Sequence, residues 1–231
     1  LAHDLGHYAR RLALDDGDTL CKGKVLFIFG SHIQWLYNRL DSCAPIIGKA
    51  LQLNVAACDL MYIIGNKIHL GQMAVLTGFS VKRLLDLGVD FHDFATYTYQ
   101  YKDGAHLGLG FMYVFQQLAC LPIDPSRQTE THAQFRAKVL DMNMPMCQTY
   151  YATWATLVDF LCERYEDAIE MSQLADRTQQ GLRGQLMIPL WTMVRILAAC
   201  TLLWRDTEAV EASSGVGSAA AAATPAANRL S

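Results

Sequence analysis

The stretch PMCQTYYATWATLVDFL, residues 145–161, decides the fold class of this chain of 231 residues. Pro145 stands where proline is favoured, at the first position of a helix, and Met144 before it avoids helical backbone. Apolar side chains then recur every three or four residues, at Tyr150, Trp154, Leu157, Val158 and Leu161. This spacing predicts a helix that turns one apolar face toward a core.

The same helical spacing of apolar residues extends over most of the chain. It recurs upstream, for example between residues 44 and 57, and downstream as far as Trp204. Two short runs, Val25–Phe29 and Thr96–Tyr101, are also consistent with strands, but such runs alone do not make an α/β sheet. We therefore predict an all-α fold of about nine or ten helices, an array of antiparallel helix pairs of the helical-repeat or solenoid type.

Local signals also mark where segments begin and end. Asp124-Pro125 predicts the start of one helix, and Gly181 predicts the end of another. After residue 205 the composition falls to Ala, Ser, Gly and Thr, which bury too little side chain to offset the entropy of ordering. We expect a helical domain at residues 1–205 and a disordered tail or linker at residues 206–231. Since Leu1 already lies within a helical pattern, we expect the chain to be a fragment of a longer protein.

Charge and cysteine content limit the class of function. The formal net charge is -3 and the Lys and Arg residues are scattered, so we expect no nucleic-acid partner. The seven cysteines are odd in number and widely spaced, and no C-x-x-C occurs, which argues against a disulfide framework or a zinc knuckle. We expect these cysteines to fill the core of a cytoplasmic protein that has neither a cofactor nor a metal.

The segment His3-Asp4-Leu5-Gly6-His7 is the candidate for catalytic chemistry. Two histidines four residues apart share a helix face, which is the spacing of zinc proteases, and the His-Asp pair suggests a metal-dependent phosphohydrolase of the HD type. Such a site needs one more histidine upstream and a distant aspartate, and the sequence identifies neither. An HD-type phosphohydrolase using His3, Asp4 and His7 is therefore the alternative, and a pair of surface histidines is the preferred interpretation.

Two further segments resemble a nucleotide-binding motif and a membrane span, but we interpret both as structural. Gly108-Leu109-Gly110 lacks the third glycine and the preceding strand of a dinucleotide-binding fingerprint. Leu186–Trp204 is almost as long and apolar as a membrane span. Arg195 lies at its centre, however, and a central arginine costs roughly 2.5–3.5 kcal/mol in a bilayer. We therefore predict a mostly buried helix and expect no membrane span.

Several stretches resemble one family. They are HYARRLAL at residues 7–14, KVLFIFG at 24–30, IQW at 33–35, CDLMY at 58–62 and YEDAIE at 165–170. These stretches are similar to the helical, TPR-like region that follows the AAA/STAND-type ATPase in large multidomain signalling proteins, which also contain a Ser/Thr kinase-like domain, a GAF domain and a histidine kinase. The resemblance implies that residues 25–29 are helical. Cys58 departs from the family, which usually has glycine at that turn.

Spacing and resemblance agree on the last helix pair. Tyr165, Ala168 and Ala175 have the spacing of the second helix of a TPR repeat, in which small residues let helices approach closely. The helix that contains Trp154 is its expected partner. We predict structural packing roles for Trp35, Trp154, Tyr165, Ala168 and Ala175.

The function implied by the resemblance is regulatory. The chain is expected to be a non-catalytic interaction segment that couples the ATPase to the output domains, through protein partners or flanking domains of the same chain. The kinase and ATPase motifs of the family are missing here, so neither activity carries over. Tyr97, Tyr99 and Tyr101 are candidates for an interaction patch, because aromatic side chains are preferred anchors, and burial in the core is their alternative.

Overall fold

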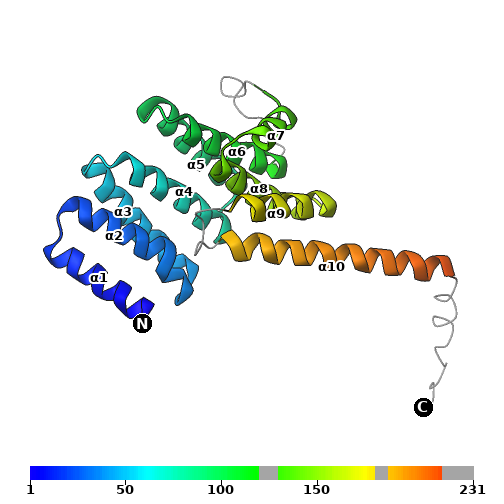
Figure 1. The fold of residues 1–231 in the computed structure, drawn as a ribbon, viewed down its shortest axis with the longest axis horizontal. Coiled ribbons are helices and arrows are strands. Elements are labelled where there is room, and N and C mark those ends of the chain that lie inside the picture. Colours follow the sequence, from blue (N-terminus) through cyan, green and yellow to red (C-terminus); the bar gives the residue numbers. More distant parts are fainter. Residues whose placement is uncertain (120–129, 180–186, 215–231) are drawn as a thin grey trace, which may run out of the picture.

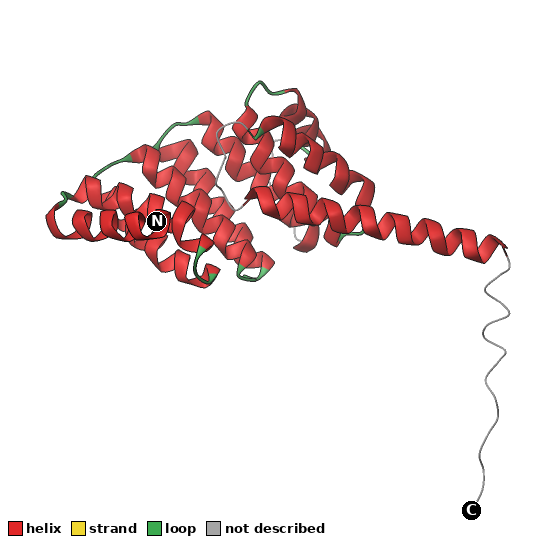
Figure 2. Ribbon diagram, turned by 60° about the horizontal axis from the view of Figure 1, so that its bottom comes forward, coloured by secondary structure: helices red, strands yellow, loops and turns green. Residues whose placement is uncertain are grey.

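The computed structural model describes residues 1–119, 130–179 and 187–214, and every regular element in these residues is a helix (Figure 1, Figure 2). The α-helices are α1 (Ala2–Asp16), α2 (Thr19–Ile28), α3 (Cys43–Ala56), α4 (Leu60–Leu76), α5 (Val81–Asp93), α6 (Lys102–Ala119), α7 (His132–Asp141), α8 (Pro145–Leu161), α9 (Tyr165–Thr178) and α10 (Met187–Ser214). Short π-helical turns, Phe29–Ile33 and Phe94–Thr98, follow α2 and α5, and 3-10 turns, Gln34–Leu36 and Leu40–Ser42, precede α3. The all-α prediction is confirmed.

Both strand alternatives are wrong. Residues 25–29 lie in α2 and the π-helical turn after it, and residues 96–98 lie in the turn that continues α5. Leu26 and Phe27 pack against Ala50 of α3. A lone strand at that place would leave buried backbone groups unpaired, whereas a helix pairs them within itself.

Several helix starts follow directly from the local sequence. Helix α8 begins at Pro145, as predicted. Helix α7 begins at His132, where the Thr131 hydroxyl accepts from the backbone N–H of Gln134 and the Gln134 side chain accepts from the backbone N–H of Thr131. The signals predicted at Asp124-Pro125 and Gly181 lie outside the described residues.

Helix α8 is buried nearly all round rather than along one face. Twelve of its residues are buried, and α6, α7, α9 and α10 pack against it. We predicted that α8 buries a single apolar face, but its buried surface extends nearly all the way around the helix. Three threonines that share the core, Thr149, Thr153 and Thr156, each donate a side-chain hydrogen bond of 2.8 Å to the carbonyl oxygen four residues back. Each hydroxyl thus has a hydrogen-bond partner within the helix, so these polar side chains can be buried in the core.

Three helix-to-helix turns share one geometry. Cys58 after α3, Gly78 after α4 and Glu163 after α8 have φ values of 53°, 78° and 61°, in the left-handed region. In each turn the N–H of the next residue donates to the carbonyl oxygen five residues back, at 2.9, 3.0 and 2.8 Å respectively. This pattern is the Schellman ending, which glycine suits best because it lacks a Cβ. Gly78 therefore suits its turn, whereas Cys58 and Glu163 hold a backbone conformation that a Cβ disfavours.

Small residues stand where helices come closest. Ala168 of α9 is fully buried in a cluster with Tyr165 of α9 and Ala198 of α10, and Phe160 of α8 packs against the same cluster. Between α5 and α6, a Cβ added at Gly108 would lie 2.9 Å from the Cα of His92, closer than real contacts allow. Gly108 thus serves helix packing, which is consistent with its exclusion as a nucleotide-binding glycine.

Helix α10 extends away from the rest of the fold (Figure 1). Its inner face, with Leu190, Trp191, Val194 and Ala198, is buried. Only 28% of the most apolar part of the helix is buried, so the prediction of a mostly buried helix is wrong. Met187–Val210 is the one helical segment of the described residues that is long and apolar enough to cross a membrane. The helix continues to Ser214, past the boundary expected at residue 205, and residues 215–231 lie outside the described residues.

We predict that Ala168→Phe destabilises the fold by about 1–3 kcal/mol, because a ring at the fully buried contact between α9 and α10 overpacks it. The matched control is Ala209→Phe, at an exposed position of α10, which should change stability by less than about 0.5 kcal/mol. Urea unfolding of both variants and the parent measures the difference. Equal midpoints for Ala168→Phe and the parent would remove the contact assignment.

We predict that Cys58→Gly stabilises the chain by about 0.5–1 kcal/mol, because it relieves the left-handed conformation of a residue with a Cβ. Cys21→Gly is the control: Cys21 is exposed within α2, where glycine should cost stability instead. Thermal unfolding compares the two. A loss of stability in Cys58→Gly equal to that in Cys21→Gly would contradict the turn geometry.

Candidate functional site

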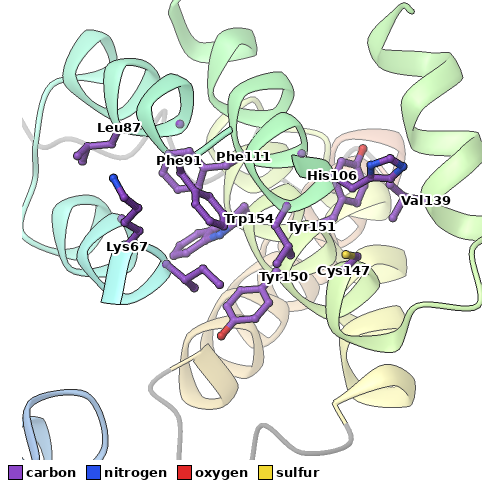
Figure 3. Close-up of a pocket in the computed structure, with 15 residues that line it drawn as sticks. Lys67, Leu87, Phe91, His106, Phe111, Val139, Cys147, Tyr150, Tyr151 and Trp154 are labelled. Carbon is purple, nitrogen blue, oxygen red and sulfur yellow. The ribbon is translucent and has the colours of Figure 1, made fainter. Parts of the chain in front are cut away.

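A small apolar pocket lies where five helices, α4 to α8, meet (Figure 3). It is lined by Lys67, Ile68, Gly71, Leu87, Gly88, Phe91, His106, Leu107, Gly110, Phe111, Val139, Cys147, Tyr150, Tyr151 and Trp154. The free space inside it is about 40 Å3. One water needs roughly 10–15 Å3 of such space, so the pocket holds a few waters or a very small molecule unless side chains move.

The walls of the pocket are packed aromatic rings. The Phe111 and Trp154 rings meet edge to face, with centroids 5.9 Å apart, and Phe111 also contacts Phe115 at 4.6 Å. Gly88 of α5 faces this wall, where an added Cβ would lie 2.7 Å from Met112. The missing side chain at Gly88 therefore lets α5 approach α6.

Lys67 brings a positive charge to one end of the pocket (Figure 3). Its ammonium group forms an ion pair with Asp90 of α5 and lies 5.3 Å from the centre of the Phe94 ring. The Lys67 side chain is only 16% exposed, so the pair is partly shielded from solvent. Lys67 thus ties α4 to α5 beside the pocket.

The titratable groups deeper in the pocket are held in their neutral forms. Burial raises the pKa of the Cys147 thiol to about 12, and the thiol donates to the carbonyl oxygen of Asp103 at 3.4 Å. Burial also raises the pKa of Tyr151 and lowers that of His106. A catalytic nucleophile or base needs a pKa shifted toward the working pH, and these shifts run away from it. The pocket is therefore suited to packing or to binding a small apolar group.

A second cluster, of buried polar side chains, lies between α2, α3 and α4. Asn54 and Asn66 are fully buried, and neither side-chain group of Asn54 has a hydrogen-bond partner among the described residues. The His69 ring lies 5.6 Å from the His32 ring, and its Nδ1 likewise lacks a partner there. Gln72, one turn further along α4, donates to the Met187 sulfur at 3.0 Å and so connects this cluster to the start of α10.

Burial and the nearby His32 lower the pKa of His69 to about 3. The imidazole is therefore neutral in the folded chain at neutral pH. An uncharged ring fits this interior, because an isolated charge there would be poorly solvated.

The residues of the catalytic alternative, His3, Asp4 and His7, lie together in α1. The Nε2 atoms of His3 and His7 lie 3.0 Å apart, and His3 Nδ1 lies 3.8 Å from a carboxylate oxygen of Asp4. Tyr37 and Phe29 pack against the two imidazoles. Within the described residues, no group of three or more His, Cys, Asp or Glu side chains is placed to hold a metal ion.

The predicted packing residues lie in three different places. Trp154 lies in the main core, with Ala175 in the same cluster. Tyr165 and Ala168 share the contact between α9 and α10. Trp35 is half-buried against Cys43, Ile47 and Met73, far along the chain from the others.

The three tyrosines do not present one surface. Tyr97 is 74% exposed. Tyr99 and Tyr101 are half-buried against the main core, and their ring centroids are 5.5 Å apart. An interaction patch at this place would therefore have Tyr97 as its exposed member.

Sequence reasoning missed the pairing partner of Arg195. Asp176 of α9 accepts from the Arg195 guanidinium and, at 2.8 Å, from the indole Nε1 of Trp191. Nothing in the sequence singled out Asp176. The prediction that the cysteines fill the core holds for Cys43 and Cys147, which are buried. It is wrong for Cys21, Cys58 and Cys200, which are exposed.

Comparison of the chain with protein families, with curated proteins and with solved structures finds no significant match.

We predict that acid destabilises this fold through His69. The unfolded chain protonates this histidine near pH 6.5 and the folded chain only near pH 3, so its contribution is complete above pH 6.5 and is lost as the pH falls toward 3. Between pH 7 and pH 5 the loss should be about 2 kcal/mol. His69→Met removes the group, and its urea unfolding free energy should fall less over the same interval. Identical pH dependence in the variant and the parent would refute the assignment.

Proposed function

We propose that this chain is a non-catalytic helical interaction and regulatory segment, which couples an ATPase to the output domains of a cytoplasmic signalling protein. In this proposal the helices form TPR-like antiparallel pairs. The observation that carries the proposal is the exposed apolar side of α10, because a large exposed apolar surface marks a place where protein or lipid binds.

Two features support the array of helix pairs. The turns at Cys58 and Glu163 have matching backbone geometry, and in both the next helix begins two residues later. Each helix also packs mainly against its neighbours in sequence, as α2 does with α3, α3 with α4, and α8 with α9. Contacts between sequence neighbours are typical of repeat arrays.

The outer faces at both ends of this array are apolar. On α1, Leu5, Tyr8 and Leu12 are each at least half exposed. On α10, Leu203 and Trp204 are more than 60% exposed. The end of a repeat array that faces only water normally has a polar outer face. Apolar ends are consistent with further protein packing at these places, which is what a segment between flanking domains requires.

The neutral state of Cys147, Tyr151 and His106 supports a non-catalytic role. The alternative of an HD-type phosphohydrolase has no observation in its favour, because His3, Asp4 and His7 find no further ligand in the described residues.

We predict that replacing Ile196 and Leu203 with aspartate in the multidomain protein changes its regulation but leaves nucleotide hydrolysis intact. Both side chains are exposed, so the fold should tolerate the change, while coupling typically worth about 1–3 kcal/mol is lost. Hydrolysis and downstream output are measured separately. Met61→Asp, at a 72% exposed position of α4, is the control and should alter neither.

Two results would count against the function. If the double variant lost hydrolysis while the ATPase remained folded and nucleotide-bound, this segment would belong to the catalytic unit. If output were insensitive to the variant, and also to deletion of residues 1–205, the segment would be a passive spacer.

A further inference from the structure

The exposed side of α10 carries a continuous row of mostly apolar side chains. We call this row the outer stripe; its members are Met193, Ile196, Leu197, Cys200, Leu203 and Trp204. Their spacing of three and four residues keeps them on one face over nearly three helical turns. This face is opposite Trp191 and Ala198, which pack on the body of the protein.

We propose that two copies of this chain associate through their outer stripes, in an antiparallel helix pair with its two-fold axis at Cys200. The inference rests on the proposed function, because it names the partner of the same face of α10. An antiparallel arrangement about Cys200 brings Ile196 of one copy beside Trp204 of the other, and Leu197 beside Leu203. Four large side chains thus meet in pairs on both sides of the axis, while Met193 faces Thr207.

Residue size at the axis favours this register. Cys200 is the smallest member of the outer stripe and is exposed at its middle. Small residues at a helix crossing let the two backbones approach, while larger ones on each side fill the space that opens as the helices diverge. A register shifted by a full turn would leave more of the large side chains without a counterpart than the one, Met193, that the Cys200 register leaves.

Charge favours the antiparallel direction. No charged residue lies in the outer stripe. Arg195 and Arg205 are paired on the body side of α10, with Asp176 and Glu163 respectively. Asp206 and Glu208 follow the stripe, so a parallel pair would set these carboxylates of both copies at the same level, whereas the antiparallel pair separates them. It also sets the two helix dipoles in opposite directions.

The available surface is sufficient for a stable pair. From the exposed fractions of its five large members, the outer stripe offers at most on the order of 600 Å2 per copy, at the lower end of the roughly 600–1,000 Å2 that each partner buries in a standard interface. A membrane surface is a poorer occupant of the stripe. Interfacial helices usually carry several Lys or Arg beside the apolar face, and here two arginines stand against two acidic residues between Met193 and Val210.

Association is measured by sedimentation velocity on the whole chain, over a hundredfold range of concentration. The parent should show a concentration-dependent dimer, and Leu203→Asp should weaken association at least about tenfold. Met61→Asp, which places the same charge at another exposed apolar position, should leave the dimer unchanged. A parent that remains monomeric throughout, or a dimer that Leu203→Asp does not weaken, would overturn the proposal.

Disulfide trapping tests the register. Mild oxidation should link two chains through Cys200, and Cys200→Ser should abolish the linked dimer although Cys21 and Cys58 are also exposed. If the linkage survived Cys200→Ser, or if an engineered Ile196→Cys, Trp204→Cys pair in a Cys200→Ser background did not crosslink, the antiparallel register would be wrong.

The outcomes separate this inference from the proposed function. A monomeric chain whose Ile196→Asp, Leu203→Asp double variant still alters output in the multidomain protein overturns the dimer and keeps the function, with a different helix as the occupant. A monomer that binds neutral phosphatidylcholine vesicles through the stripe assigns the face to a membrane and overturns the dimer. A dimer trapped at Cys200, together with output that neither the double variant nor deletion of residues 1–205 changes, supports the dimer and removes the function.

Discussion

Helix α8 has to be covered on every side, and the surrounding helices are arranged to do this. Its backbone and three threonines bring polar groups into the core, and they fit because each hydroxyl is paired within the helix. At its end, buried Asp159 is paired with Arg164, which also donates to Gln117 of α6 at 2.6 Å. The same contacts therefore position α6, the turn after α8, and α9. With α8 removed, both the pocket and the base of α10 would lose a wall.

Much of the fold could be predicted because short-range sequence patterns determine where its helices form. Pro145 fixes the start of α8, and the apolar spacing after it fixes the helical state. Ala168 was expected at a helix contact from its spacing, and it lies fully buried in the cluster that α9 shares with α10. Cys58 has a left-handed backbone that glycine would suit better, and only the resemblance, not the local sequence, drew attention to this position.

What could not be predicted depends on contacts between distant segments. The pocket takes one or a few side chains from each of five helices, and no local pattern records which of them meet. Burial of α10 was overestimated because an apolar composition does not show how many sides of a helix are covered. Tyr97 was grouped with Tyr99 and Tyr101, but Tyr97 is exposed in the π-helical turn after α5, whereas the other two follow this turn and are half-buried. The Asp176 partner of Arg195 belonged to another helix and had no marker in the sequence.

The attachment of α10 has a mechanical consequence. Asp176 holds Trp191 and Arg195, Ala198 is fully buried against α9, and Arg205 pairs with Glu163 and lies over the Tyr165 ring. These contacts fix α10 to α9 at several points along its length, so the two helices form one rigid unit. The part of α10 beyond Arg195 extends to Ser214 and is about 30 Å long, given the rise of about 1.5 Å per residue. A rotation of this unit by about 10° would move the far end of α10 by about 5 Å, so α10 acts as a lever arm that enlarges small movements of α9.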